Sequence, residues 1–203
     1  MVPLDPHIRP HPDFPRLAEA MHDLVAAEAT PWSGVLYRMA EPTYAAREDR
    51  LDGVGARIHG GRWNPAGLAC VYGSLDPETA FSEILAVARY YGLPLSGRLP
   101  QTLFAFDADL RRTLDLTRDP TLRTLRVAIP NLQAEAWRPA IDAGEESLTQ
   151  ALGRAAASAG LGGLVVPSAA ADEGRNLAIF PASLTSKDRL RTRNPEGLQP
   201  NHQ

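Results

Sequence analysis

The order of strand-like and helix-like segments along this chain is the feature that most limits its fold. Short apolar runs with strand character occur at residues 34–40, 68–74, 101–107, 112–117, 161–168 and 176–180. Segments with helical periodicity fall between them, at residues 15–29, 76–92, 119–127 and 145–160. Because strands and helices are interspersed without the regular spacing of βαβ units, the pattern predicts an α+β fold and not a doubly wound parallel sheet.

The segment 76–92 is the clearest helix of the chain. Asp76 is a candidate N-cap, Pro77 suits the first turn, and Gly92 ends the helix. The expected apolar face consists of Phe81, Ile84, Leu85 and Ala88, with Glu83 beside it. The helix at 15–29 follows another candidate cap, Asp13.

The two ends of the chain predict extended arms. The first fifteen residues contain five prolines, and the stretch 185–203 is polar and almost without apolar periodicity. The charged, glycine-bearing segment 41–61 is expected to be a long loop. We therefore divide the chain into an N-terminal arm and helix (1–33), a main domain (34–185) and a polar C-terminal tail (186–203).

Composition excludes several functional classes. A net charge of −3 argues against binding a nucleic-acid backbone or an anionic membrane by bulk charge. Cys70 is the single cysteine, so an intrachain disulfide is impossible, and with five scattered histidines no metal site is expected. The N-terminus lacks the pattern of a signal peptide, and no apolar run reaches the ~18 residues that span a bilayer. We expect a cytoplasmic protein.

Common catalytic motifs are missing from the sequence. The run DGVGARI has two glycines at dinucleotide-fold spacing, but Ile58 replaces the third and no strand precedes it. The phosphate-loop, HExxH and G-x-S-x-G patterns are also absent. His59 is interpreted as a solvated loop residue.

The stretch HGGRWNPAG, residues 59–67, carries more chemistry than a turn requires. Gly60, Gly61 and Pro65 suffice to form a loop. Trp63 is expected to seal that loop against the core and Asn64 to bond to backbone within the turn. This leaves a rigid loop built around one arginine, Arg62.

Several runs in a fixed order resemble one known family. They are LYR, HGGRWNPAG, VYGS, AFSEIL, GLVVPS and RNLAIFP, which carry Arg38, Arg62, Tyr72, Glu83, Ser168 and Asn176. This set is similar to the RES domain over about residues 36–181. The resemblance implies an ADP-ribosyltransferase-like fold, with a mixed or antiparallel sheet core and flanking helices. It also implies the toxin of a bacterial toxin–antitoxin pair, which consumes NAD+ as a substrate and holds no tightly bound cofactor.

The resemblance also implies partners. The expected partner is an antitoxin with a helix-turn-helix-like DNA-binding domain, and a homodimer within a hetero-oligomer is compatible with it. Direct contact with nucleic acid or a membrane is not expected. The N-terminal arm is longer than the motifs require, so it is a candidate to cover the cleft or to form an interface.

The chemistry of NAD+ gives each residue an expected role. A guanidinium fits phosphate oxygens in pairs, so Arg62 is expected to bind the pyrophosphate, and Arg38 is expected to take part in NAD+ binding. Breaking the nicotinamide–ribose bond expels a neutral group from a cationic one, so a single carboxylate, Glu83, suffices to stabilise the oxocarbenium-like charge. Tyr72 offers a ring for nicotinamide stacking. The catalytic set is thus Glu83, Arg62 and Tyr72, and Ser168 and Asn176 complete the substrate-binding set with Arg38.

The sequence leaves the acceptor undetermined and allows two alternatives without catalysis. The acceptor of the ADP-ribosyl group is water (a glycohydrolase), phosphate (a phosphorylase) or a protein side chain (an ADP-ribosyltransferase). A non-catalytic module could use Arg38, Arg62 and Tyr72 to bind a nucleotide or single-stranded RNA. An inactive scaffold that only pairs with an antitoxin is the second such alternative.

Overall fold

The computed structural model describes residues 1–45, 49–94 and 100–193 of the chain. The strands are β1 (Thr30–Ala40), β2 (Val71–Ser74), β3 (Thr102–Asp115), β4 (Gly163–Pro167), β5 (Arg175–Ile179) and β6 (Arg189–Thr192). The helices are α1 (Phe14–Glu28), α2 (Pro42–Ala45), α3 (Val54–His59), α4 (Pro77–Tyr90), α5 (Asp119–Leu125), α6 (Ile129–Ala134), α7 (Trp137–Asp142), α8 (Leu148–Ser158) and the 3₁₀ turn η2 (Pro181–Ser183).

The strands form one mixed sheet in the order β1-β2-β5-β4-β3-β6, and β1 also pairs with β3. The β3–β4 pair is parallel and the other pairs are antiparallel. Because β1 pairs with both β2 and β3, the strands β1, β2, β5, β4 and β3 form a closed ring in which each strand pairs with the next. This architecture confirms the predicted α+β fold with a mixed sheet core.

The longest pairing in the sheet joins β1 to β3, from Thr30 opposite Thr113 to Ala40 opposite Thr102. The two strands expected at 101–107 and 112–117 are therefore one continuous strand. The polar residues between these two apolar runs do not end the strand, because β1 and β6 bind its backbone there. The sequence pattern thus predicts two strands where backbone pairing forms one.

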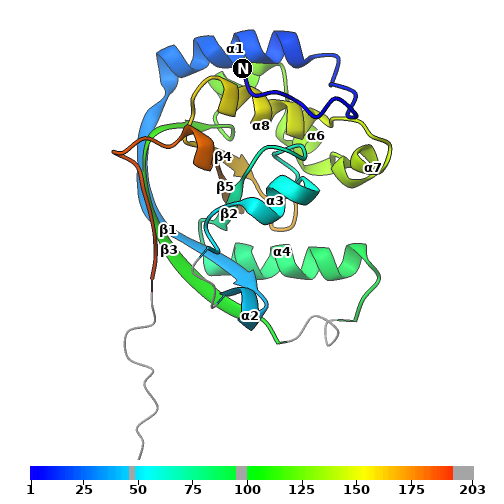
Figure 1. The fold of residues 1–203 in the computed structure, drawn as a ribbon, viewed down its shortest axis with the longest axis vertical. Helices are drawn as coiled ribbons and strands as arrows, with labels where there is room; N and C mark the ends of the chain where they lie inside the picture. The colour runs from blue at the N-terminus through cyan, green and yellow to red at the C-terminus, as the bar shows by residue number, and fades with distance from the viewer. Residues whose placement is uncertain (46–48, 95–99, 194–203) are drawn as a thin grey trace, which may run out of the picture.

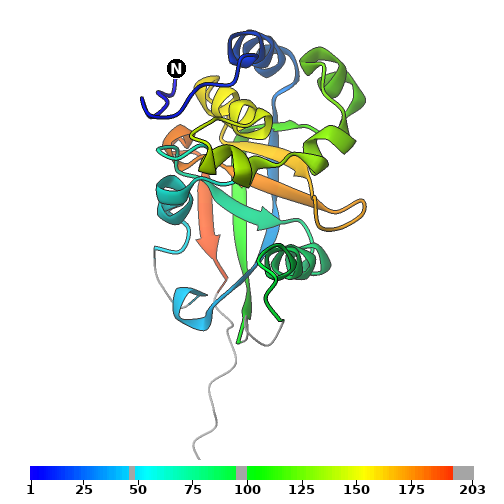
Figure 2. The ribbon, with the colours of Figure 1, turned by 90° about the vertical axis from the view of Figure 1, so that its right-hand side faces the viewer.

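Both faces of the sheet are covered by apolar side chains. On one face α8 packs against β4 and α1 packs against α8 and β3, on the side of the sheet where Figures 1 and 2 show both helices; the cluster there includes Leu17, Leu152 and Leu164. The other face holds a second cluster, which includes Phe106 and Val165. Leu164 and Val165 belong to opposite clusters because successive strand residues point to opposite faces.

Helix α4 begins as the sequence predicts, but it buries a different face. The Asp76 side chain accepts a hydrogen bond of 2.7 Å from the Thr79 N–H, so the predicted cap is confirmed. The predicted apolar face is wrong for Phe81, whose exposed fraction is 49%. Ala88 is buried as predicted, and Ala80, outside the predicted face, is buried too, because α4 packs against β1 and β2 through its small residues.

Two regions expected to be irregular contain regular structure. The predicted long loop at 41–61 includes α2 and α3, apart from 46–48, which lie outside the described residues. The polar stretch at 185–203 includes β6, which pairs with β3 from Phe106 to Asp109. The expectation of an extended C-terminal arm is wrong there, since backbone pairing needs no apolar pattern; its last ten residues, 194–203, lie outside the described residues.

The N-terminal segment packs along α8. The Val2 N–H donates to Ser158 Oγ at 2.8 Å, and Arg9 forms a parallel bridge with Glu145. Asp13 occupies the N-cap position of α1, but its side chain makes no capping hydrogen bond and contacts Arg16 instead, so the expected cap is wrong. Within the described residues, no helix is long and apolar enough to cross a membrane.

Candidate active site

The loop between α3 and β2 is held rigid by hydrogen bonds to Asn64 and Tyr72. Asn64 is fully buried, and its Nδ2 donates to the carbonyl oxygens of Ala56, Pro65 and Leu68 at 2.8–3.2 Å. The Tyr72 hydroxyl donates to Asn64 Oδ1 at 2.6 Å and accepts from the Trp63 N–H at 2.9 Å. These contacts confirm the structural roles predicted for Trp63, which is 2% exposed, and Asn64.

Helix α8 lies directly against this loop. A Cβ atom added to Gly153 would lie 1.7 Å from the Trp63 carbonyl oxygen, so only glycine permits this approach. Gln150, one turn earlier on α8, donates through Nε2 to the Gly61 carbonyl at 3.0 Å. The loop therefore rests on the buried face of α8, and Arg62 projects from a fixed backbone.

Arg62 is partly buried; one nitrogen of its guanidinium binds backbone carbonyls, and the side chain also lines the pocket. Its Nη1 donates to the carbonyls of Leu132 and Glu135 at 3.0 and 3.2 Å. Within the described residues, its Nε and Nη2 make no hydrogen bond. Burial is the main cause that lowers the pKa of Arg62, and the nearby Glu83 carboxylate opposes that shift.

Glu83 lies on α4 and has one carboxylate oxygen held by two donors. Its Oε1 accepts from Ser168 Oγ and from Asn176 Nδ2, both at 2.7 Å. Asn176 Oδ1 in turn accepts from Ser74 Oγ at 2.7 Å, which fixes the amide so that its Nδ2 faces Glu83. Within the described residues, Glu83 Oε2 accepts no hydrogen bond, so one oxygen is anchored and the other remains available.

Ser168 lies behind the carboxylate and does not line the pocket. It is fully buried, and its Oγ accepts from the N–H groups of Ala170 and Ala171 at 3.0 and 3.1 Å while it donates to Glu83. The expected direct contact of Ser168 with a substrate is therefore not available in this arrangement. Its hydrogen bond to Oε1 instead holds the Glu83 carboxylate in one orientation.

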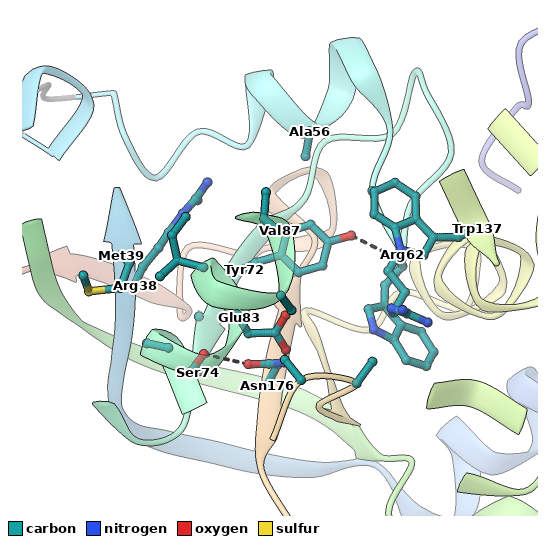
Figure 3. Close-up of a pocket in the computed structure, with 18 of the residues that line it drawn as sticks. Arg38, Met39, Ala56, Arg62, Tyr72, Ser74, Glu83, Val87, Trp137 and Asn176 are labelled. Atoms are coloured by element: carbon teal, nitrogen blue, oxygen red, sulfur yellow. Dashed lines mark hydrogen bonds between the residues drawn. The ribbon is translucent and has the colours of Figure 1, made fainter. Parts of the chain in front are cut away.

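A cavity of about 490 Å³ joins these side chains. Of the predicted site residues, Arg38, Arg62, Tyr72, Glu83 and Asn176 line it. In Figure 3, Arg38 and Met39 lie toward one end and Arg62 and Trp137 toward the other, with Glu83 and Asn176 between. The volume is typical of a small-molecule or cofactor pocket.

The pocket wall is cationic although the chain is acidic overall. The charged residues that line it are Arg38, Arg62, Arg138 and Glu83, so three guanidiniums accompany one carboxylate. The Arg38 guanidinium lies over the Tyr44 ring, 5.3 Å from its centroid. The pocket is suited to an anionic ligand that also needs one carboxylate.

Tyr72 contributes a ring and not a proton donor. Burial raises the pKa of its hydroxyl well above the usual value, so the group stays protonated at neutral pH. Both hydrogen bonds of the hydroxyl go to the loop, and the ring lines the pocket. The predicted alternation is confirmed, because Val71 is buried in the second cluster while Tyr72 lines the cavity.

Residues 35–196 match the family described as the RES domain. The chain belongs to the RES domain family. It is 31% identical over 151 residues to a protein of Sphingobium sp. (strain YBL2) named "Prs ADP-ribosylating toxin", a match that covers 74% of this chain and 84% of the relative. The fold is similar to a chain in the crystal structure of the M. tuberculosis MbcT-MbcA toxin-antitoxin complex, with a TM-score of 0.66 and 24% identity over 88% of this chain and 91% of that chain.

Sequence reasoning did not predict several residues of this RES domain pocket, among them Trp137, Arg138 and Ser74. Trp137 and Arg138 come from α7, a six-residue helix that no sequence pattern predicted. Ser74 is the last residue of β2, in the VYGS run, and the sequence predicted a site role only for Tyr72 in that run. A tryptophan beside an arginine in a polar segment was the one signal for the α7 pair. Within the described residues, the segment 1–33 contributes nothing to the pocket wall, so it does not cover the cleft there.

Proposed function

We propose that this RES domain cleaves NAD+ at the nicotinamide–ribose bond and acts as the toxin of a toxin–antitoxin pair. One observation carries the proposal. Glu83 presents a free Oε2 at the wall of a cationic pocket, while Ser168 and Asn176 hold its Oε1 at 2.7 Å. A fixed carboxylate beside arginines matches a substrate that has a pyrophosphate and develops positive charge on a ribose.

The carboxylate stabilises the charge that develops as the bond breaks. Nicotinamide leaves as a neutral molecule with the bonding electron pair, and the ribose carbon becomes oxocarbenium-like. Glu83 is already oriented by two donors, so little reorganisation is needed when that charge appears. Its free oxygen is placed to meet the charged ribose or a ribose hydroxyl.

The remaining residues bind and orient the substrate. Arg62 uses its free N–H groups on the pyrophosphate, and Arg38 adds positive charge from β1. The Tyr72 ring, fixed through its hydroxyl, forms the surface on which nicotinamide stacks. Ser168 is a positioning residue that acts through Glu83, because it is fully buried.

Two acceptors would complete the reaction without a protein target. With water, the products are ADP-ribose, nicotinamide and a proton. With inorganic phosphate, the products are ADP-ribose 1-phosphate and nicotinamide. Transfer to a protein side chain is the second candidate, and the 31% identical relative named as an ADP-ribosylating toxin favours it.

An antitoxin is the proposed partner. The fold is similar to a chain of a toxin-antitoxin complex, and a protein that drains NAD+ must be silenced in its host. We propose that the antitoxin carries a helix-turn-helix-like DNA-binding domain and that both proteins act in the cytoplasm.

Release of free nicotinamide tests the reaction. Purified protein is incubated with NAD+ alone, with phosphate, and with host lysate proteins, and nicotinamide and ADP-ribosyl products are separated by chromatography. Each acceptor gives a different second product, and transfer also labels protein when the adenine moiety is radioactive. The absence of nicotinamide in all three reactions at high enzyme concentration would refute cleavage and favour a binding module.

A further inference from the structure

We propose that Arg138 is a second anion-binding residue of the pocket, and that with Arg62 it recognises two adjacent phosphate groups. The proposal rests on the proposed function for the identity of the substrate, but it makes a separate claim about binding. A ligand that carries a diphosphate would be held by two guanidiniums from different segments, the 60–67 loop and α7.

Aromatic rings hold the Arg138 guanidinium in place. Its central carbon lies 4.2 Å from the centroid of the Trp137 ring and 4.5 Å from that of Tyr90, at the end of α4. A cation–π contact attracts the guanidinium to the ring face through its charge and takes up no N–H donor in a conventional hydrogen bond. The two ring contacts therefore position Arg138 and leave its N–H groups available as hydrogen-bond donors.

Among the residues that the structure describes, no acidic side chain pairs with Arg138. Within the described residues, it forms no ion pair and donates no hydrogen bond, although it lines the pocket. The nearest candidate in sequence, Glu135, uses its Oε1 to accept the Leu148 N–H at 3.1 Å, at the start of α8. The Arg138 donors are thus open to an acceptor within the cavity.

Arg138 and Arg62 lie close enough to repel each other. The positive charge of Arg138 adds to burial in lowering the pKa of Arg62. Two guanidiniums that face one cavity gain most from an anion placed between them, because one anion offsets both the repulsion and the lost hydration. A diphosphate offers each arginine its own phosphate oxygens, whereas Arg62 alone has already committed Nη1 to two carbonyls.

Binding of inorganic pyrophosphate and inorganic phosphate, measured calorimetrically at fixed ionic strength, tests the proposal. We expect the wild-type protein to bind pyrophosphate more tightly than phosphate. Arg138→Ala should weaken pyrophosphate binding by about 10–100-fold, the scale of a charged hydrogen-bonded contact, and bring the two dissociation constants together. Arg123→Ala, an exposed arginine on α5, is the matched control and should leave both constants unchanged.

A second variant separates binding from folding. Arg138→Gln keeps a planar side chain against Trp137 and Tyr90 but removes the charge, so it should lose the preference for pyrophosphate with a smaller drop in Tm. If both variants keep that preference, Arg138 only bridges α7 to α4 and the proposal is wrong. Because no turnover is measured, loss of pyrophosphate binding would stand even if nicotinamide release were never observed.

Discussion

Asn176 Nδ2 donates a hydrogen bond of 2.7 Å to Glu83 Oε1, and this contact joins β5 to α4 across 93 residues of sequence. Ser168 Oγ donates to the same oxygen from the loop that follows β4. The two donors are neutral, so they orient the carboxylate without cancelling its charge.

Glu83→Gln should depress turnover and spare binding. The amide oxygen can still accept from Ser168 and Asn176, but the negative charge that meets the ribose is lost. We expect kcat for nicotinamide release to fall by ~10²–10³, the usual scale for one electrostatic group aimed at a transition state, with little change in the Kd for NAD+. Glu78→Gln, an exposed position on the same helix, is the control. Near-normal turnover in folded Glu83→Gln would remove this carboxylate from the mechanism.

Ser74→Ala should lower kcat more mildly than Glu83→Gln. Without the Ser74 hydroxyl, the Asn176 amide can rotate and present its oxygen to Glu83. Loss of one such hydrogen bond, about 1 kcal/mol, corresponds to roughly a fivefold drop in kcat. Ser33→Ala, at an exposed position on β1, should have no effect. A change confined to Tm would show that Ser74 serves stability alone.

Glu146→Gln should destabilise the fold strongly. Glu146 and Arg154 form a buried ion pair with N–O distances of 2.6 and 2.7 Å, and Glu146 Oε2 also accepts the His11 N–H from the N-terminal segment. Removing one charge leaves the other buried and unpaired, which costs about 3–5 kcal/mol. Chemical denaturation measures the cost. The neighbouring pair of Glu145 with Arg9 is exposed, so Glu145→Gln should cost under ~1 kcal/mol. Equal costs for the two variants would contradict this account.

Gly153→Ala should destabilise the protein although helix propensity predicts the reverse. In an open helix position the change to alanine gains up to ~1 kcal/mol. At Gly153 the new Cβ would lie 1.7 Å from the Trp63 carbonyl oxygen, so α8 or the loop must shift. A Cβ added to Gly55 on α3 would have no atom within 4 Å, and Gly55→Ala is the control expected to be neutral or stabilising. Only Gly153→Ala should therefore lower the free energy of unfolding.

The stability of the protein should fall at alkaline pH. Burial raises the pKa of Cys70 to about 12, above the ~8.5 of an unfolded thiol. The folded state therefore keeps a proton that the unfolded state loses, so stability is full below pH ~8.5 and declines as pH rises toward 12. The slope approaches about 1.4 kcal/mol per pH unit for this group. Cys70→Ala should flatten the stability profile between pH 9 and 10, measured by denaturation; an unchanged profile would show that the thiol does not titrate in this way.

Local pattern was enough to predict most elements of this fold. The Asp76 cap, the turn at Gly92 and the alternation of Val71 and Tyr72 were all read from neighbouring residues, because helix and strand periodicity is set within a few positions. The pattern failed for β6, for the short helices α2, α3, α6 and α7, for the continuity of β3, and for the burial of Phe81. In those places pairing or packing with distant segments decided the outcome, and neither leaves a local signature.

The sequence by itself determined the α+β class, the rigid loop around Arg62 and the family to which the chain belongs, since each depends on residue types in a fixed order. Only the tertiary structure decided what faces the pocket. It placed Ser168 behind Glu83, brought Ser74 against Asn176, and turned α7 so that Arg138 lines the cavity. The physical reason is that a hydrogen bond or a stacked pair depends on distances of a few ångströms between segments far apart in the chain, and those distances are fixed only when the core packs.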